Sequence, residues 1–419
     1  MNSRARLALL LLITLMLSVF WAFLVPTDPS GFQPDEASHF AVIRFMAENS
    51  GALPPYTMEY NIALHPPLYH EIAALLYSIL SPVFGAESAR VGVRLVSAFL
   101  STGTVYAVYL MARQTRLCRP VAIPVATLAA LIPMRLSLSG AASNENLAAL
   151  GAAASLYVLF SGIRRGFSNR RIALLSFWTV IAIGSKITCL GLLLAIGVAA
   201  LVVRKPSPSW RGTGAVVLIP VLAVLLSLGW WFIDNTVRYG DPVRKNAVHE
   251  LFGDLMPGYA GISARTGMPA WRYLLSIVGA GWFSFWGQFA GMRFRLPAGI
   301  YVALFAAQLV SLWGIATRLH RFPGLSRTQI AIGAATTAFA AWVLMIYIQY
   351  NWQYYTPQGR YFFVLLGPIA IFLVGGIHLF LQRYVPDRGY QQAVWMLGGL
   401  LLLLLNLYTL FLMPRLWVA

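Results

Sequence analysis

The sequence predicts an all-α polytopic membrane protein with about eleven transmembrane helices. Its 419 residues are 59% hydrophobic and only 11% charged, whereas soluble domains carry about 25% charged residues. Its mean hydropathy is +0.70, and apolar runs of spanning length recur from one end of the chain to the other. We therefore treat residues 1–419 as a single membrane-embedded domain.

The formal net charge of +18 raises the question of a nucleic-acid partner. The basic residues, however, occur in short clusters between apolar runs, which is typical of cytoplasmic loops under the positive-inside rule. We interpret the positive charge as a consequence of membrane topology, because the basic clusters mark cytoplasmic loops. Membrane lipids, and not nucleic acid, are the partners that this pattern predicts.

The first apolar run, residues 7–25, follows Arg4 and Arg6. It has no small-residue cleavage site and is long for a signal peptide, so we expect a retained anchor with a cytoplasmic N-terminus. The predicted single spans lie near 7–25, 90–111, 120–138, 145–163, 212–233, 298–317, 329–349, 361–381 and 392–413.

Two further stretches need a different interpretation. Residues 171–203 are too long for one helix and have basic clusters at both ends, including Arg204-Lys205, so we expect two short helices turning near Gly184-Ser185-Lys186. Residues 271–290 are rich in tryptophan and phenylalanine, which favours an interfacial or re-entrant segment over a full span. With these choices the C-terminus is extracytoplasmic.

This topology gives two large extracytoplasmic segments, residues 26–88 and 234–297. Asp387 is the only one of the 13 acids that falls on the cytoplasmic side. Seven acids lie within 26–88, in what is otherwise a chain of apolar composition; they are Asp28, Asp35, Glu36, Glu48, Glu59, Glu71 and Glu87. We therefore expect the chemistry of the protein in the first of these segments.

The first candidate motif is Pro34-Asp35-Glu36-Ala37-Ser38-His39. Proline at a first helical position places Asp35 and Glu36 in the first turn of a helix on the membrane, with His39 on the face of Asp35. Asp35 then suits a general base that takes a proton from an attacking hydroxyl or amine, with Glu36 and His39 positioning it. The alternative is that these acids only complement the helix dipole.

The second motif is His65-Pro66-Pro67-Leu68-Tyr69-His70. Its proline pair fixes the backbone and starts another interfacial helix, so His65 stands at a rigid corner where it can orient a phosphate or a sugar. The alternative is a helix-start histidine without a ligand. We expect no cofactor, but the oxygen and nitrogen atoms of both motifs leave a divalent metal open, through Asp35, Glu36, His39, His65 and His70.

Two charged residues stand beside apolar spans. Glu145 follows Ser143-Asn144 at the outer start of a span, where it is either a second acid of the site or a helix-capping acid. Lys186 lies in the predicted turn between two apolar helices with no acid near it in the sequence. An intramembrane lysine indicates a functional partner, unless it reaches out to the membrane surface.

The last outer loop, residues 349–361, is dense in aromatic and amide side chains and ends in Gln358-Gly359-Arg360-Tyr361. Aromatic faces and amides suit sugars, and a guanidinium suits phosphate oxygens. The alternative is an aromatic belt at the membrane interface with one anchoring arginine.

Taken together, these motifs resemble the GT-C superfamily of membrane glycosyltransferases, which includes protein O-mannosyltransferases, lipid A aminoarabinose transferases and a related bacterial family of predicted polytopic proteins. The resemblance rests on Asp35-Glu36, the His65 to Tyr69 motif, Glu145, Lys186 and the Gln358 to Tyr361 motif. It implies an inverting transfer of a sugar from a polyprenyl-phosphate carrier to a glycan, lipid or protein at the outer face of the bacterial inner membrane.

In that reaction the resemblance makes Asp35 the base and has Lys186 and Arg360 neutralise the leaving phosphate. One departure is Glu145, since many relatives have aspartate there. The alternative of a different class is a transporter or flippase, which needs polar residues along a path through the bilayer centre. The donor sugar, the acceptor, the carrier length and the oligomeric state are not encoded in any motif that we recognise.

Overall fold

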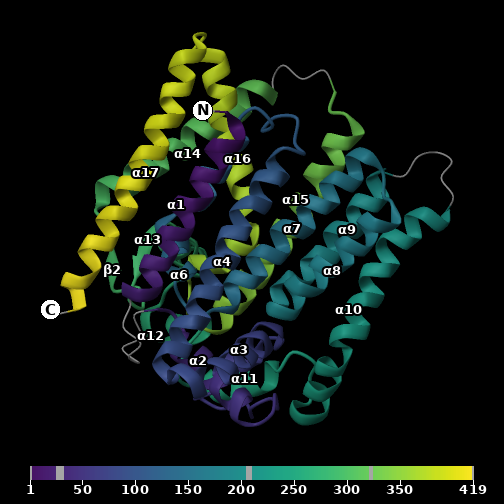
Figure 1. Ribbon diagram of the computed structural model, residues 1–419, viewed down its shortest axis with the longest axis vertical. Helices are drawn as coiled ribbons and strands as arrows, with labels where there is room; N and C mark the ends of the chain where they lie inside the picture. Colours follow the sequence, from purple (N-terminus) through teal and green to yellow (C-terminus); the bar gives the residue numbers. More distant parts are fainter. Residues whose placement is uncertain (1, 25–32, 204–209, 320–323, 418–419) are drawn as a thin grey trace.

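The computed structural model describes residues 2–24, 33–203, 210–319 and 324–417, and its regular structure is almost entirely helical (Figure 1). This confirms the predicted fold class. The α-helices are α1 Ser3–Leu24, α2 Glu36–Glu48, α3 Leu68–Phe84, α4 Ala86–Ala112, α5 Ala122–Ala130, α6 Pro133–Ser139, α7 Asn144–Arg165, α8 Asn169–Ser185, α9 Gly191–Val203, α10 Trp210–Tyr239, α11 Lys245–Phe252, α12 Tyr259–Thr266, α13 Ala270–Gly287, α14 Ala298–Leu319, α15 Arg327–Gln353, α16 Leu366–Tyr384 and α17 Arg388–Trp417. The 3₁₀ helices are η1 Asn61–Leu64, η2 Ile187–Leu190 and η3 Gly359–Leu365, and β1 Gln288–Phe289 pairs antiparallel with β2 Phe294–Arg295.

Within the described residues, eight helices are long and apolar enough to cross a membrane. They are α1, α4, α7, α10, α14, α15, η3 with α16, and α17, each at a predicted run. The bent pair α5 and α6 raises the number to nine. α8 has 17 residues and α9 has 13, too few for the same test, so the total of about eleven spans stays a prediction.

The run predicted to span at 120–138 is broken into two helices. α5 and α6 are bent by 66° at the break between them. Pro133 is the first residue of α6, and a proline disfavours helical backbone in the residue before it. Ile132 accordingly has extended backbone, with φ −69° and ψ 118°. All seven residues of α6 are buried, so this helix lies inside the bundle.

The break predicted near Gly184-Ser185-Lys186 is confirmed. α8 ends at Ser185, Lys186 has extended backbone with φ −153°, and η2 leads into α9. α7 holds this turn in place, because a methyl group on Gly151 would lie 2.7 Å from the backbone nitrogen of Ala182 in α8. The two helix backbones therefore touch, and the turn lies beside the start of α7.

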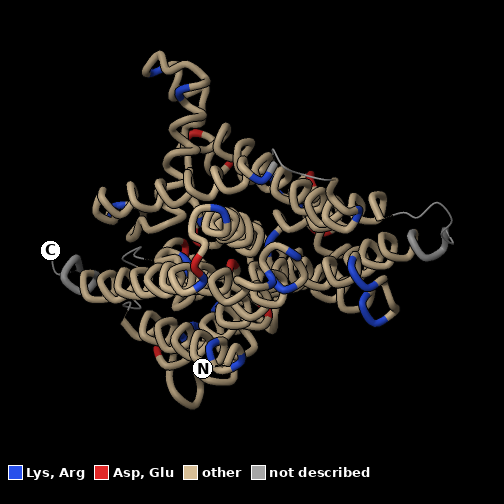
Figure 2. Tube along the Cα trace, turned by 90° about the horizontal axis from the view of Figure 1, so that it is seen from above, with Lys and Arg blue, Asp and Glu red and all other residues tan. Residues whose placement is uncertain are grey.

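The elements between the long helices gather at one end of the bundle, where α2, α3 and α11 lie opposite the N-terminus (Figure 1). α2 and α3 are the short helices expected in the first outer segment. Residues 26–32 of that segment, with Asp28, lie outside the described residues, as does the Arg204-Lys205 cluster. Lysines and arginines colour more of the chain than acids do (Figure 2), in keeping with the net charge of +18.

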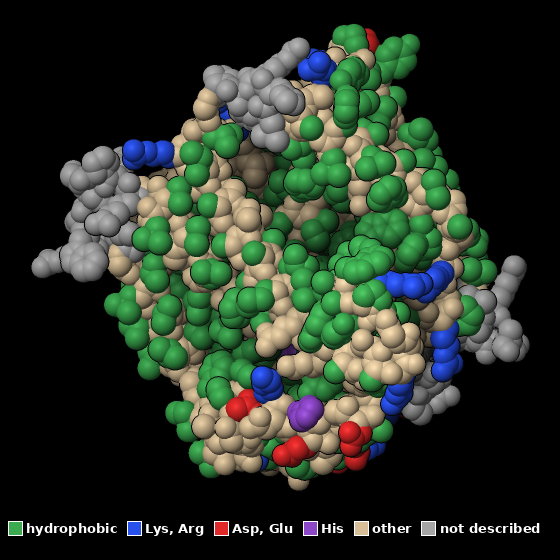
Figure 3. Space-filling view, turned by 180° about the vertical axis from the view of Figure 1, so that it is seen from behind, with side chains coloured by type: hydrophobic (Ala, Val, Ile, Leu, Met, Phe, Trp, Pro, Cys, Tyr) green, Lys and Arg blue, Asp and Glu red, His purple; other side chains and the backbone are tan. Residues whose placement is uncertain are grey.

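Hydrophobic side chains cover much of the face of the bundle seen in Figure 3. Leu226 is 85% exposed and Val237 80% exposed, both on α10. Water would make such a surface costly, whereas lipid tails are its natural solvent. Together with the spanning helices, this surface identifies an integral membrane protein.

Candidate active site

Asp35 and Arg360 form an ion pair that joins the start of α2 to η3, with Arg360 Nη2 donating to Asp35 Oδ2. Arg360 Nε donates to Gln358 Oε1 over 2.6 Å, which fixes the direction of the guanidinium. The arginine side chain is only 4% exposed, whereas that of Asp35 is 40% exposed. The carboxylate is thus the member of the pair that a molecule arriving from outside can reach.

The predicted position of Asp35 in the first turn of a helix is wrong. α2 begins at Glu36, and Asp35 precedes it with left-handed backbone, φ 58°. Aspartate is among the residues that tolerate this conformation. Its side chain makes no capping hydrogen bond to α2. The carboxylate is therefore turned from the helix toward Arg360.

Glu145 and Lys186 form a second ion pair, in which Lys186 Nζ donates to Glu145 Oε1 over 2.6 Å. Their side chains are 5% and 2% exposed, so the interpretation of Lys186 as a residue reaching out to the membrane surface is wrong. The side chain of Ser143 caps α7 by accepting from Glu145 N. The cap is thus the serine, and the carboxylate of Glu145 is free for Lys186.

Tyr361 lies between the two ion pairs. The Lys186 Nζ atom is 4.9 Å from the centroid of its ring, and the Arg360 Cζ atom is 5.6 Å from it. Cations are attracted to an aromatic face at these distances. One ring thus brings two cations and two carboxylates into a single centre. In the sequence, Tyr361 is the last residue of the Gln358 to Tyr361 motif, and the pattern indicates no role for it.

Three histidines border this centre. One imidazole of the His39 and His70 pair donates to the other, between His39 Nδ1 and His70 Nε2 over 2.9 Å, and the rings stack with centroids 5.1 Å apart. Tyr69 packs edge-on against His39 and shares a hydrogen bond with Ser97, 3.2 Å long, which makes it a wall of the site. The sequence had offered His70 only as a metal ligand.

Burial holds the three imidazoles in their neutral forms. It lowers the pKa of His70 from 6.5 to about 3. For His39, burial and then the neighbouring His70 and Arg360 lower the pKa well below 6.5. Burial and then Lys186 lower the pKa of His65 in the same way. His65 is therefore close to the cations of the centre, and it is neutral there near pH 7.

These pKa shifts predict that acid destabilises the protein. Below pH 6.5 these histidines are protonated in the unfolded chain but stay neutral in the folded protein, down to about pH 3 for His70. The free energy of unfolding therefore falls by about 1.4 kcal/mol for each unit that the pH is lowered, for each histidine. Unfolding midpoints of the solubilised protein between pH 8 and 5 measure this slope. In His70→Gln, one proton fewer should be taken up on unfolding, so the free energy of unfolding should depend less steeply on pH. Equal slopes for the variant and the wild type would contradict a neutral, buried His70.

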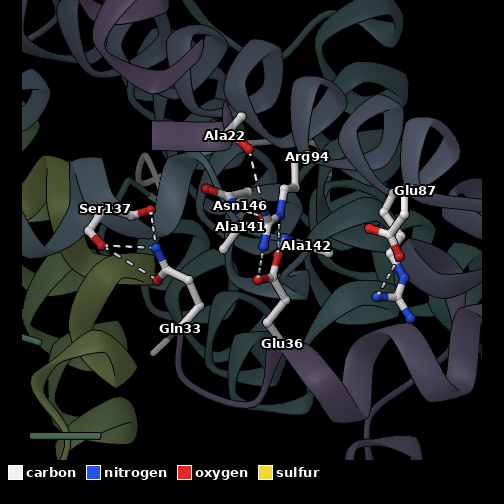
Figure 4. A network of polar contacts seen from close by, with 10 residues as sticks. Ala22, Gln33, Glu36, Glu87, Arg94, Ser137, Ala141, Ala142 and Asn146 are labelled. Carbon is white, nitrogen blue, oxygen red and sulfur yellow. Dashed lines mark hydrogen bonds and ion pairs between the residues drawn. The ribbon is translucent and has the colours of Figure 1, made fainter. Parts of the chain in front are cut away.

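Glu36 is held by a separate set of contacts (Figure 4). Its two oxygens accept from Arg94 Nε over 2.9 Å and Nη2 over 2.6 Å, and one of them also accepts from Ala142 N over 2.7 Å. Arg94 Nη1 donates in turn to the carbonyl of Ala22 at the end of α1. Glu36 thus joins α1, α2, α4 and the turn before α7. Such contacts suit a positioning role for Glu36 beside Asp35, and no motif in the sequence pointed to Arg94 as its partner.

We expect Glu36→Gln to lower the free energy of unfolding by about 3–5 kcal/mol, because it removes the carboxylate that pairs with the buried Arg94 guanidinium. Thermal unfolding in detergent measures the loss. Glu87→Gln is the matched control: this acid is 65% exposed and pairs with Arg90 over 3.3 Å at the surface, so its midpoint should stay that of the wild type. Equal midpoints for both variants would show that the Glu36 contacts are dispensable.

Arg244 ties the segment 234–297 to the first outer segment. It lies between α10 and α11, is 1% exposed, and donates from Nη1 to the carbonyl of Ala63 over 2.8 Å. Nε donates to Asn235 over 2.6 Å, and the guanidinium stands 4.7 Å above the ring of Tyr239. Ala63 is two residues before His65, so this contact fixes the turn that presents the histidine. No motif in the sequence pointed to Arg244.

A metal ion is not suggested by the arrangement of the side chains. Throughout the described ranges, no three His, Cys, Asp or Glu side chains gather so that they could hold one. Of the residues considered for a metal, namely Asp35, Glu36, His39, His65 and His70, Glu36 pairs with Arg94 and His70 with His39, and whether the protein uses a divalent metal stays a prediction.

An apolar groove of about 690 Å³ runs between α13, α14, α15 and α16. Tyr347 and Phe362 belong to its wall, with ring centroids 4.8 Å apart. The Tyr347 ring is also 6.2 Å from the ring of Tyr361. One wall of the groove is therefore one aromatic layer from the charged centre.

Comparison with known proteins gives one family model and several structures. The model described as dolichyl-phosphate-mannose-protein mannosyltransferase matches residues 33–235, and no curated protein matches significantly. The crystal structure of ArnT from Cupriavidus metallidurans bound to undecaprenyl phosphate is 16% identical with a TM-score of 0.55, over 94% of this chain and 63% of that one.

Two structures from Archaeoglobus fulgidus are also similar. Its oligosaccharyltransferase in complex with Zn and sulfate is 16% identical with a TM-score of 0.52, over 96% of this chain and 52% of that one. AglB in complex with an inhibitory peptide and a dolichol-phosphate is 16% identical with a TM-score of 0.50, over 97% and 55%. This chain thus spans less than two thirds of the length of each structure. The matches confirm the resemblance to GT-C proteins and show that the fold is shared.

Proposed function

We propose that this chain, with its GT-C fold, is an inverting glycosyltransferase. It moves a sugar from a polyprenyl-phosphate carrier to a cell-envelope glycan, lipid or protein, at the extracytoplasmic face of the bacterial cytoplasmic membrane. The observation that carries the proposal is the centre around Tyr361, where a carboxylate open to the outside and two buried cations meet near the wall of an apolar groove.

The two cations suit the phosphate of the donor. Arg360 presents several N–H groups in a plane that matches phosphate oxygens, and Lys186 adds a compact charge near the same Tyr361 ring. The negative charge on the phosphate grows as the bond to the sugar breaks. Fixed cations in a buried site stabilise that growing charge strongly.

Asp35 is the base in this proposal. Its carboxylate takes the proton of the acceptor hydroxyl while the hydroxyl oxygen bonds to the anomeric carbon. The bond from that carbon to the phosphate oxygen breaks, and polyprenyl phosphate leaves with the electron pair. Attack from the face opposite the phosphate inverts the configuration of the sugar. In the resting protein Arg360 holds Asp35, so the incoming phosphate competes for Arg360 and releases the base.

The apolar groove suits the isoprenoid chain of the donor. One of its walls lies one aromatic layer from the charged centre, which allows a phosphate at the two cations and a tail in the membrane at the same time. Two of the similar structures hold lipid carriers, undecaprenyl phosphate in ArnT and a dolichol-phosphate in AglB. Both observations support a polyprenyl-phosphate donor for this chain.

The test is turnover of labelled donors by the purified protein in proteoliposomes. A panel of polyprenyl-phosphate sugars is supplied with cell-envelope extract as the acceptor, and release of polyprenyl phosphate with label in the acceptor is the expected result. Label that crosses the bilayer while still attached to its carrier, with no carrier released, would replace the enzyme by the flippase alternative.

A further inference from the structure

Two buried polar atoms of the centre have no hydrogen-bond partner among the described residues, Glu145 Oε2 and His65 Nδ1. Glu145 is 4% exposed, and its other oxygen accepts from Lys186. A buried polar group without a partner is unfavourable, so native proteins rarely keep one without a reason such as a ligand. Glu145 Oε2 therefore points to a group that arrives with the substrate.

The chemistry of that group follows from the carboxylate. An ionised carboxylate only accepts hydrogen bonds, so the partner of Oε2 must donate one. A phosphate oxygen carries negative charge near pH 7 and would be repelled. An ammonium group would meet the charge of Lys186, whose Nζ lies 2.6 Å from the other oxygen of the same carboxylate. The partner of Glu145 Oε2 is therefore an uncharged hydrogen-bond donor.

Lys186 further limits which uncharged donor can bind to Glu145. An ammonium has three N–H donors, and that of Lys186 gives one of them to Glu145. The pair thus offers an acceptor and a donor side by side, which suits a hydroxyl because a hydroxyl both donates and accepts. An acetamido group has a donor and an acceptor on two different atoms, its nitrogen and its carbonyl oxygen, and it adds a bulky acyl group, so it fits the side-by-side pair less well than a single hydroxyl oxygen.

We infer that Glu145 and Lys186 together bind a hydroxyl of the sugar that is transferred, and that Glu145 selects the donor. This inference rests on the proposed function. Because Lys186 and Arg360 both lie near the ring of Tyr361, where the proposed function has the phosphate bind, the hydroxyl is the one nearest the phosphate, on C2 of the sugar. The preferred donors are polyprenyl-phosphate hexoses with a free 2-hydroxyl, and 2-acetamido sugars are rejected.

The experiment compares three polyprenyl-phosphate donors that differ only at C2, with hydroxyl, hydrogen or acetamido there. Both equilibrium binding and kcat/KM are measured for the wild type, for Glu145→Gln and for the control Glu87→Gln at the exposed surface. The wild type and the control should prefer the 2-hydroxy donor over the 2-deoxy donor by about 10- to 100-fold. Glu145→Gln replaces the charged acceptor by a neutral amide, and the preference should fall below about threefold.

The outcomes separate this inference from the proposed function. Wild-type transfer with equal kcat/KM for the 2-hydroxy and 2-deoxy donors would keep the function and overturn the inference, without any need for a folded variant. Preferential binding of the 2-hydroxy donor without transfer would support the inference and overturn the function. An unchanged preference in Glu145→Gln would also overturn the inference, since Glu145 would then serve only to hold Lys186.

Discussion

Asp35→Asn should reduce sugar transfer by about 10²- to 10⁴-fold in kcat, the range for loss of a general base. The amide cannot take the proton of the acceptor. Asparagine tolerates the left-handed backbone at this position, where φ is 58°, and its oxygen can still accept from Arg360. The fold should therefore persist. Initial rates of label transfer at saturating donor, with the unfolding midpoint as a check on folding, measure the effect.

Glu59→Gln is the control for this experiment, since Glu59 is an exposed acid of the same segment. It should transfer sugar at the wild-type rate. If Asp35→Asn keeps a rate within about threefold of the wild type, Asp35 is no base and is only the residue that precedes α2.

Arg360→Lys should lower kcat/KM for the donor by about 10²- to 10³-fold, the usual loss when one donor to a developing negative charge is removed. Lysine keeps the charge, but it has no planar fork to hold phosphate and Gln358 together. Because the phosphate gains charge as the reaction proceeds, kcat should fall as well as affinity. Steady-state kinetics with a donor series, and binding of bare polyprenyl phosphate, measure the two effects separately.

Arg383→Ala provides the comparison, because Arg383 lies near the other end of α16 and stacks only on Tyr384 in the contacts that are resolved. Its kinetics should equal those of the wild type. An Arg360→Lys protein with unchanged kcat and a raised KM alone would indicate that Arg360 binds the ground state and does not stabilise the leaving phosphate.

The sequence was sufficient for eight of the spans and for most residues of the centre, because both leave local signals. A run of apolar residues identifies a span wherever it packs. A proline pair fixes the start of α3 at Leu68, and a charge such as Lys186 in an apolar stretch is conspicuous on energetic grounds alone.

The partners of these charges could not be predicted, since pairing depends on how helices pack. Lys186 has no acid near it in the sequence, and Glu145 lies 41 residues away. Glu36 is next to Asp35, yet its carboxylate turns to Arg94, 58 residues away. The left-handed backbone of Asp35 turns its carboxylate toward Arg360 while that of Glu36 points to Arg94. No pattern of residue types in the sequence predicts this backbone angle.

The 66° bend between α5 and α6 is an intermediate case. The sequence shows Pro133 inside an apolar run. A proline there is compatible with two outcomes, a break between two helices or a single kinked span. The length of the run favoured a span. The helix that follows the break is short and fully buried, which depends on the space that α1 and α4 leave for it.

The contact between Asp35 and Arg360 also bears on how the protein is made. The two residues are 325 positions apart, and a ribosome adding about 5–20 residues per second needs about 15–65 s to travel between them. During that time the first helices of the nascent chain are already in the bilayer, but the carboxylate of Asp35 has no Arg360 with which to pair, because Arg360 has not been synthesised. The Asp35–Arg360 pair, and the centre built around it, can therefore form only after Arg360 has been synthesised.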